Sequence, residues 1–228
     1  MKKILIVSPH CDDAELGCGG YIARSVYEGN EVFVWIVSSG DVFFSHLDRI
    51  VTSEERLEET KASLEILGAK IYGIGFPGKD TLLDSLPRAH GIQILDNVIQ
   101  EYGPDEVLIP LPSFHQDHLW THEICIAATR PTAAIRQPNL IAAYEYPLQK
   151  WGNGSCADPA NGGIYIDISQ YIDIKISALS CYKSQMRGSN NSLSLQSVRA
   201  LAKTRGYESN FTYAELFHTL RRRVPDVS

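Results

Sequence analysis

The sequence predicts an α/β fold in which a mostly parallel sheet is covered by helices on both faces. Short apolar runs alternate along the chain with segments that have the spacing of amphipathic helices. The apolar runs are continuous and rich in β-branched residues, which is typical of parallel strands buried on both faces. The chain has 228 residues, 44% of them hydrophobic, which is enough for one complete core.

Five segments have the character of buried strands. They are Ile4–Ser8, Val32–Ser38, Lys70–Phe76, Glu106–Pro110 and Asn139–Tyr144. In parallel sheets of this kind, ligands bind outside the carboxyl ends of the strands. We therefore expect a functional site in the loops that follow Ser8, Ser38, Phe76 and Pro110.

Helical segments lie between these strands. The first is expected from about Glu15 to Glu28, because Gly29 follows as a C-terminal signal. The second opens with Thr52-Ser53-Glu54-Glu55, a capping-box pattern. A third has apolar residues at 92, 95, 98 and 99, and a fourth begins near His118. The pattern weakens beyond about residue 150, so we expect a single domain, residues 1–228, with a less regular C-terminal third.

Composition excludes several classes of protein. The formal net charge is -6 and the one basic run is Arg221-Arg222-Arg223, which argues against a nucleic-acid partner. No apolar run approaches the roughly 18 residues that span a bilayer, so no membrane partner is expected. The opening residues lack the features of a signal peptide, which predicts a cytoplasmic protein. The five cysteines are scattered without a C-x-x-C pair, which favours reduced thiols.

The first expected strand runs into the polar sequence Pro9-His10-Cys11-Asp12-Asp13-Ala14-Glu15. Two adjacent carboxylates and a histidine are costly to enclose in a sheet crevice without a compensating charge. A divalent cation would supply that charge. His10 and Asp13 are three residues apart, so one turn could direct both at the same ion. Asp12 would then stand beside the ion without needing to bind it.

A second polar cluster, Ser113-Phe114-His115-Gln116-Asp117-His118, follows the fourth expected strand at the same edge of the sheet. A set made of His10, Asp13 and His118 would offer two nitrogens and one carboxylate and would leave at least one position open. Such a set is expected of a catalytic Zn²⁺, although Fe²⁺ or another divalent metal could occupy it. Zinc lowers the pKa of a bound water to about 7, so hydroxide would be available at neutral pH.

Other residues admit weaker functional interpretations. His122 lies four residues after His118, but Leu119 replaces the glutamate that an H-E-x-x-H zinc motif requires. The segment Gly17-Cys18-Gly19-Gly20 lacks the spacing of a dinucleotide-binding loop. We expect these glycines to let a helix pack closely against the sheet. The remaining histidines, at 46, 90 and 218, are isolated and are expected to be surface or core residues.

The segment from Pro9 to Gly20 resembles the opening motif of the LmbE-like (PIG-L) deacetylases, and His115-Gln116-Asp117-His118 resembles their second motif, H-x-D-H. Weaker similarity runs through Arg56 with Glu59, Phe76-Pro77, Lys183-Ser184-Gln185 and residues 213–217, so the resemblance covers most of the chain. It implies a Rossmann-like fold and zinc-dependent removal of acetyl groups from N-acetylglucosamine conjugates.

The resemblance also implies roles for the residues of both motifs. The metal ligands would be His10, Asp13 and His118, the same set that the spacing suggests. Asp12 is similar to the general base of the family. His115 resembles the group that stabilises the developing oxyanion or protonates the leaving amine, and Asp117 would tune it.

Two further residues are candidates for substrate binding. The family often has an arginine in an R-x-x-E stretch that binds a polar or anionic substrate group, which points to Arg56. Asp80 is a plausible companion for sugar hydroxyls. Arg56 has a simpler interpretation as a solvated residue, because its expected helix is rich in glutamates.

Three positions depart from the family pattern. Cys11 replaces the usual proline, and Ala14-Glu15 shifts a common glutamate by one position. Tyr182 stands where many members have a histidine, which bears on the substrate and not on the chemistry.

The expected partner is a small amino-sugar substrate, and a homo-oligomer stays open. Two rival functions also stay open: an amidase that acts on a thiol conjugate, and a catalytically silent sugar- or nucleotide-binding module. A base beside a metal-ligand set argues against the silent module.

Overall fold

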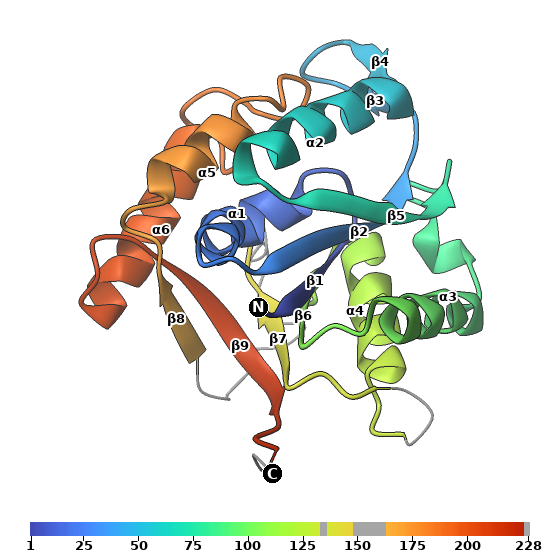
Figure 1. Ribbon diagram of the computed structural model, residues 1–228. Helices are drawn as coiled ribbons and strands as arrows, with labels where there is room; N and C mark the ends of the chain where they lie inside the picture. Colours follow the sequence, from blue (N-terminus) through green and yellow to red (C-terminus); the bar gives the residue numbers. More distant parts are fainter. Residues whose placement is uncertain (133–135, 148–162, 226–228) are drawn as a thin grey trace.

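A seven-stranded sheet with the order β5-β2-β1-β6-β7-β9-β8 forms the centre of the protein (Figure 1). The computed structural model describes residues 1–132, 136–147 and 163–225. The strands of the sheet are β1 Lys3–Ser8, β2 Glu31–Ser39, β5 Lys70–Pro77, β6 Glu106–Pro110, β7 Leu140–Tyr144, β8 Gly163–Asp167 and β9 Ala214–Arg222. Five strands pair in parallel, whereas β9 pairs antiparallel with both β7 and β8. The mostly parallel sheet that the sequence predicts is confirmed.

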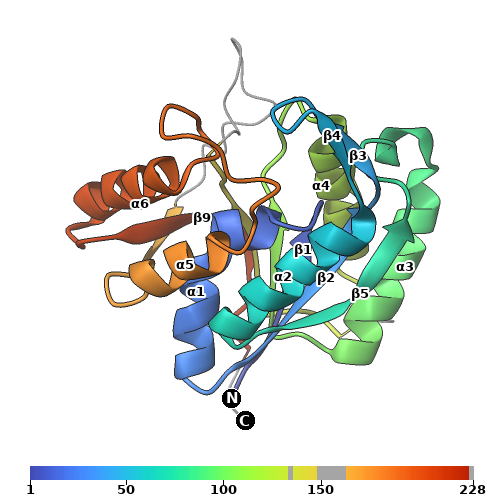
Figure 2. The same cartoon turned by 90° about the horizontal axis from the view of Figure 1, so that it is seen from above.

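Helices cover both faces of this sheet, also as predicted. They are α1 Asp13–Tyr27, α2 Ser53–Leu67, α3 Arg88–Tyr102, α4 Gln116–Ala128, α5 Ile172–Leu179 and α6 Leu195–Ser209. Figure 1 shows α1, α2 and α5 on one side of the sheet and α3 and α4 on the other. A short 3-10 turn, Leu83–Ser85, contacts α4. A separate hairpin, β3 Val42–Phe44 with β4 Arg49–Val51, precedes α2 (Figure 2).

The central strand β1 shows how the two layers form. Ile4 and Ile6 pack into the cluster that contains residues of α1 and α2, and Leu5 and Val7 pack into the cluster that contains residues of α3 and α4. All four side chains are fully buried. Side chains of this size each contribute about 1.5–3 kcal/mol when they are removed from water, so β1 anchors both layers.

The predicted strands agree with the observed ones to within one residue at each end. The second helix begins as its capping pattern predicts, because the Thr52 side chain accepts a hydrogen bond from the Glu55 N–H at 3.2 Å. The β3–β4 hairpin and the C-terminal elements β8, α5, α6 and β9 were not predicted. The first four residues of β9 are buried, whereas the later ones are partly buried or exposed, so the strand has no uniform burial pattern.

An ion pair from the C-terminal elements is inserted beside helix α1. Lys175 Nζ lies 2.6 Å from Glu215 Oε1 and donates to the Leu16 carbonyl oxygen at 2.8 Å. The Glu215 carboxylate accepts the N–H groups of Gly20 and Tyr21, both at 2.8 Å. Both charged side chains are buried. Helix α1, which follows the first polar motif, is therefore supported by residues of α5 and β9.

The glycines of α1 allow close packing, as the sequence suggests. A Cβ atom on Gly17 would lie 2.2 Å from Tyr144 Cδ2, in β7, and one on Gly20 would lie 2.7 Å from Ile168 Cδ1. These contacts fix how deeply α1 sits against the sheet and the C-terminal segment.

The sequence also favours reduced thiols, and it has no apolar run long enough to span a bilayer. Cys11, Cys18, Cys125 and Cys181 are free, and Cys156 lies outside the described residues. Among the helices that the structure describes, none is long and apolar enough to span a bilayer.

We expect Gly17→Ala to lower the free energy of unfolding by about 1–3 kcal/mol, because its new Cβ overlaps the Tyr144 ring and forces the helix to shift. Urea denaturation measures the change. Gly73→Ala is the matched control, since a Cβ there would meet nothing within 4 Å. Equal stability of the two variants would show that the close approach of α1 and β7 is not required.

Candidate active site

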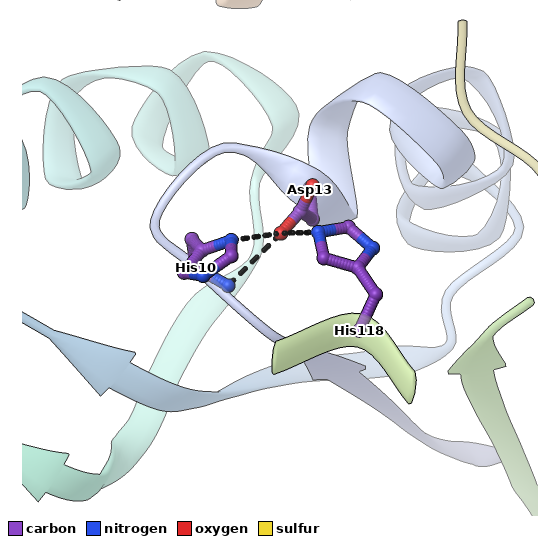
Figure 3. Close-up of side chains that lie close together, drawn as sticks. All are labelled: His10, Asp13 and His118. Atoms are coloured by element: carbon purple, nitrogen blue, oxygen red, sulfur yellow. Dashed lines mark hydrogen bonds and ion pairs between the residues drawn. The ribbon is translucent and has the colours of Figure 1, made fainter. Parts of the chain in front are cut away.

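The two polar motifs meet at the carboxyl ends of the adjacent strands β1 and β6. His10 lies in the loop after β1, Asp13 is the first residue of α1, and His118 is in the first turn of α4 (Figure 3). Asp13 Oδ2 lies 3.1 Å from His10 Nδ1 and 3.2 Å from His118 Nε2, and it accepts the His10 backbone N–H at 2.9 Å. All three residues are buried. The structure thus brings together the three ligands predicted from the sequence.

The loop that carries His10 is fixed by hydrogen bonds on both sides. Ser8 Oγ donates to the His10 carbonyl oxygen at 2.7 Å and accepts the Ala14 N–H at 3.0 Å. The Cys11 carbonyl oxygen accepts the Thr60 hydroxyl at 3.0 Å and lies 2.6 Å from the Tyr182 hydroxyl. The turn is therefore well determined without the usual proline at position 11.

Tyr182 supports this loop from behind instead of facing a substrate. Its side chain is fully buried, and its hydroxyl also lies 2.6 Å from Glu15 Oε1. Burial raises the pKa of Glu15 to about 8, which favours the protonated form of its carboxyl group near neutral pH. A protonated Glu15 can donate to Tyr182 while Tyr182 donates to the Cys11 carbonyl. The departure from histidine at position 182 is thus linked to the shape of the His10 loop.

Asp117 contacts His10, whereas the resemblance pairs it with His115. Asp117 Oδ2 lies 3.0 Å from His10 Nε2, and the carboxylate also accepts the backbone N–H groups of Thr81 at 2.6 Å and Leu83 at 3.0 Å. Burial alone would raise the pKa of Asp117, but the hydrogen bonds from His10 and these amides outweigh burial, so the pKa is lowered. At metal sites, a histidine ligand commonly donates a hydrogen bond from its second ring nitrogen to a carboxylate, which orients the ring. The spacing of the motif could not tell which histidine Asp117 contacts.

His115 caps helix α4 and lines the same cavity as His10 and His118. Its Nδ1 accepts the Asp117 backbone N–H at 3.3 Å, which leaves the ring proton of the neutral form on Nε2. Burial and the neighbouring His10 and His118 lower the pKa of His115 to about 4. The ring is therefore suited to donate a hydrogen bond from Nε2.

Asp12 also lines this cavity and is 7% exposed. Among the residues that the structure describes, no other residue donates a hydrogen bond to its carboxylate, in contrast to Asp13. Burial and the negative charge of Asp13 raise the pKa of Asp12 to about 7, although Arg56 and His10 oppose the shift. A carboxylate with free lone pairs beside the His10–Asp13–His118 cluster can accept a proton.

Arg56 is not on a solvated helix face, so the simpler interpretation of this residue is wrong. It is 3% exposed, and its guanidinium is hydrogen-bonded to Asp80 and donates to the Gly40 carbonyl at 3.3 Å. The Phe44 ring of the β3–β4 hairpin lies 5.8 Å from the guanidinium carbon. The hairpin, which the sequence did not predict, therefore buries Arg56. Both Arg56 and Asp80 line the cavity.

Sequence reasoning missed several residues of the cavity wall. Tyr146 lies over His118, with ring centroids 4.5 Å apart, and its hydroxyl is 2.9 Å from Ser113 Oγ. Gln185 and Arg187 reach the cavity from the loop between α5 and α6. The similarity around Lys183-Ser184-Gln185 was the one signal that pointed to this loop. Its backbone meets the R-x-x-E stretch directly, because Glu59 accepts the Ser184 N–H at 2.9 Å.

The donor set fits a metal ion. Within the described residues, the groups with convergent ligand atoms are His10–Asp13–His118 and His10–His115–Asp117. The first is the better candidate, because the Asp117 carboxylate is already occupied by two backbone amides. Two imidazoles and one carboxylate, all buried, match the ligands of catalytic zinc sites. The other ring nitrogen of His118, Nδ1, is buried and has no hydrogen-bond partner in the described part of the chain.

A mostly parallel α/β sheet with this donor set at its carboxyl edge defines an α/β protein with a site that could bind a metal. The chain belongs to the PIG-L family, since the family model described as GlcNAc-PI de-N-acetylase matches residues 5–129. The resemblance seen in the two motifs is thereby confirmed. Membership in this deacetylase family makes the protein a hydrolase of amide bonds.

Known proteins agree with this assignment. The chain is 28% identical over 228 residues to a diacetylchitobiose deacetylase of Thermococcus kodakarensis, covering 94% of this chain and 82% of the relative. The structure superposes on N,N'-diacetylchitobiose deacetylase from Pyrococcus horikoshii with a TM-score of 0.75 at 23% identity, covering 96% and 84% of the two chains. GalB, the 4-carboxy-2-hydroxymuconate hydratase of Pseudomonas putida, also has a TM-score of 0.75, at 22% identity and full coverage of both chains. The structural similarities establish the fold.

We expect the purified protein to bind about one divalent ion per chain, and Asp13→Ala and His118→Ala to lose it, because each removes one of three ligands. Elemental analysis after dialysis measures the metal, and circular dichroism checks folding. His122→Ala is the control, since His122 Nδ1 bonds the Pro110 carbonyl at 2.9 Å and belongs to neither candidate group. Full occupancy in folded Asp13→Ala and His118→Ala would refute the ligand assignment.

Proposed function

We propose that this protein is a zinc-dependent N-deacetylase that removes an acetyl group from an N-acetylglucosamine-like sugar or glycoconjugate. The observation that carries the proposal is the free Asp12 carboxylate beside the His10–Asp13–His118 cluster, within one cavity. The Thermococcus and Pyrococcus proteins named above are deacetylases of diacetylchitobiose, a substrate of this class. These relatives do not favour an amidase of thiol conjugates or a silent binding module.

The proposed ligands of the zinc are His10, Asp13 and His118. When bound there, zinc would polarise the substrate carbonyl and lower the pKa of water. His10 would be positioned by Asp117, whose carboxylate is bonded to the second ring nitrogen of His10 at 3.0 Å. The loop bonds from Ser8 and Tyr182 would keep His10 and Asp13 at a fixed separation.

Asp12 and His115 would move and stabilise charge during the reaction. Asp12 accepts the proton of the attacking water, since its carboxylate faces the cavity and no other residue of the described chain donates a hydrogen bond to it. General-base help of this kind is typically worth about 10² to 10⁴ in rate. His115 donates from Nε2 to the developing oxyanion, because its Nδ1 is engaged at the helix cap.

Arg56 and Asp80 would bind the sugar. Their pairing holds both side chains at the cavity wall, and the Asp80 carboxylate can accept hydrogen bonds from sugar hydroxyls. Arg56 retains N–H groups beyond those bonded to Asp80 and Gly40, and its Nε is buried without a partner among the described residues. A guanidinium can make two parallel hydrogen bonds to one polar group, which lysine cannot reproduce.

We expect Asp12→Asn to retain the metal and to lower kcat by about 10² or more, because asparagine keeps the size of the side chain but cannot accept the proton. The assay is the release of free amine from a panel of N-acetylglucosamine conjugates. Asp173→Asn is the control, since that side chain is 82% exposed on α5. No amine release by the wild-type protein on any conjugate would refute the proposed function, and normal turnover by Asp12→Asn would remove Asp12 from the mechanism.

We expect Arg56→Lys to lower kcat/KM by about tenfold on the best conjugate, because lysine keeps the charge next to Asp80 but loses the planar set of donors. Metal content and thermal stability are measured alongside. Arg49→Lys is a matched control in the nearby hairpin, where Arg49 makes an exposed pair with Glu55. Unchanged kinetics in Arg56→Lys would restrict Arg56 to a structural role.

A further inference from the structure

The loop between α5 and α6 brings two hydrogen-bond donors to the cavity that the mechanism does not use. Gln185 and Arg187 both line the cavity together with His10 and Arg56. Gln185 is 5% exposed, and its Nε2 atom is buried without a hydrogen-bond partner among the residues that the structure describes. The same holds for the Nε atom of Arg187. Buried polar atoms in native proteins nearly always have a partner, so these two point to a partner outside the described residues, such as a bound ligand.

Arg187 differs from Arg56 and Arg205, two other arginines that are buried or partly buried. Arg56 pairs with Asp80, and Arg205 makes two bonds to Glu145, at 2.6 and 2.8 Å. Within the described residues, Arg187 has no carboxylate partner. The carboxylates that face the same cavity are Asp12, Asp13 and Asp80. Asp80 is occupied by Arg56, and Asp13 by His10 and His118, and no ion pair within the described residues joins Arg187 to Asp12.

The loop presents these side chains from a fixed backbone. The Arg187 N–H donates to the Leu193 carbonyl at 3.0 Å, which closes the loop on itself. Ser184 is tied to Glu59 of α2 through its N–H, and its carbonyl oxygen lies 3.0 Å from His46 Nε2 in the β3–β4 turn. Contacts to two separate elements thus hold the segment just before Gln185, so the backbone that carries the two donors is fixed.

We propose that Gln185 and Arg187 form a subsite that binds an anionic group, a carboxylate or a phosphate, carried by the substrate. The inference rests on the proposed function, because it concerns the part of the amino-sugar conjugate beyond the acetamido group. A guanidinium has only donors, and its planar geometry matches two oxygens of a carboxylate or phosphate. The Gln185 amide adds a donor to the same group. The substrate is therefore an acidic conjugate and not a neutral oligosaccharide.

The test compares the binding of matched ligands by calorimetry, so that it does not depend on turnover. The carboxymethyl glycoside of N-acetylglucosamine is paired with its carboxamidomethyl glycoside, which is neutral and nearly the same shape. N-acetylglucosamine 1-phosphate is compared with the methyl glycoside, which distinguishes phosphate from carboxylate. We expect the wild-type protein to bind one of the acidic ligands about tenfold or more tightly than its neutral counterpart.

Arg187→Met should reduce that preference to near one, and Arg187→Lys should leave part of it. Arg130→Met is the control: it removes the same charge from an exposed pair with Asp96, outside the cavity, and should keep the wild-type preference. The inference is overturned if the wild-type protein binds acidic and neutral ligands equally, or if Arg187→Met keeps the preference. Release of amine from any of these ligands, acidic or neutral, tests the proposed function separately, so the two failures are distinguishable.

Discussion

The carboxylate of Asp13 is enclosed at the end of the central strand, with two imidazoles within 3.2 Å of one oxygen. A carboxylate buried without such partners costs several kcal/mol, so the surrounding chain must keep His10 and His118 in place. Much of the nearby structure serves this requirement. Ser8, Thr60 and Tyr182 fix the loop between β1 and α1, and Asp117 fixes the far nitrogen of the His10 ring. The proposed metal ligands are thus the innermost part of a wider polar network.

The sequence predicted the five parallel strands, because each is a short apolar run. It also predicted that the two motifs meet, because the carboxyl ends of parallel strands lie at the same edge of the sheet. It did not predict what depends on contacts between distant segments. The glutamates around Arg56 indicated a solvated helix, but the β3–β4 hairpin buries that face. The spacing of the H-x-D-H motif left the partner of Asp117 undetermined. Tyr146, Gln185 and Arg187 are single residues in irregular segments and carry no periodic signal.

The architecture alone does not determine the reaction. A hydratase and a deacetylase superpose on this structure equally well, with TM-scores of 0.75 for both. The function therefore has to be argued from the side chains at the sheet edge. One cavity contains the His10–Asp13–His118 cluster and the Asp12 carboxylate beside it. The same cavity contains Arg56, which is paired with Asp80, and Arg187, which has no carboxylate partner among the described residues. The cluster and Asp12 concern the reaction that the site can catalyse, whereas the two arginines concern which substrate it binds.

The pair formed by Lys175 and Glu215 has a consequence for how the protein is made. Residues 1–118 contain all three proposed ligands, yet α1 is supported by Lys175 and Glu215, and the His10 loop by Tyr182. During synthesis, the three proposed ligand residues therefore leave the ribosome well before the residues whose side chains hold them in position. Because domains generally fold as units during synthesis, the cluster would acquire its final shape only after β9 has joined the sheet beside β7. Metal uptake would then belong to the finished protein and not to the growing chain.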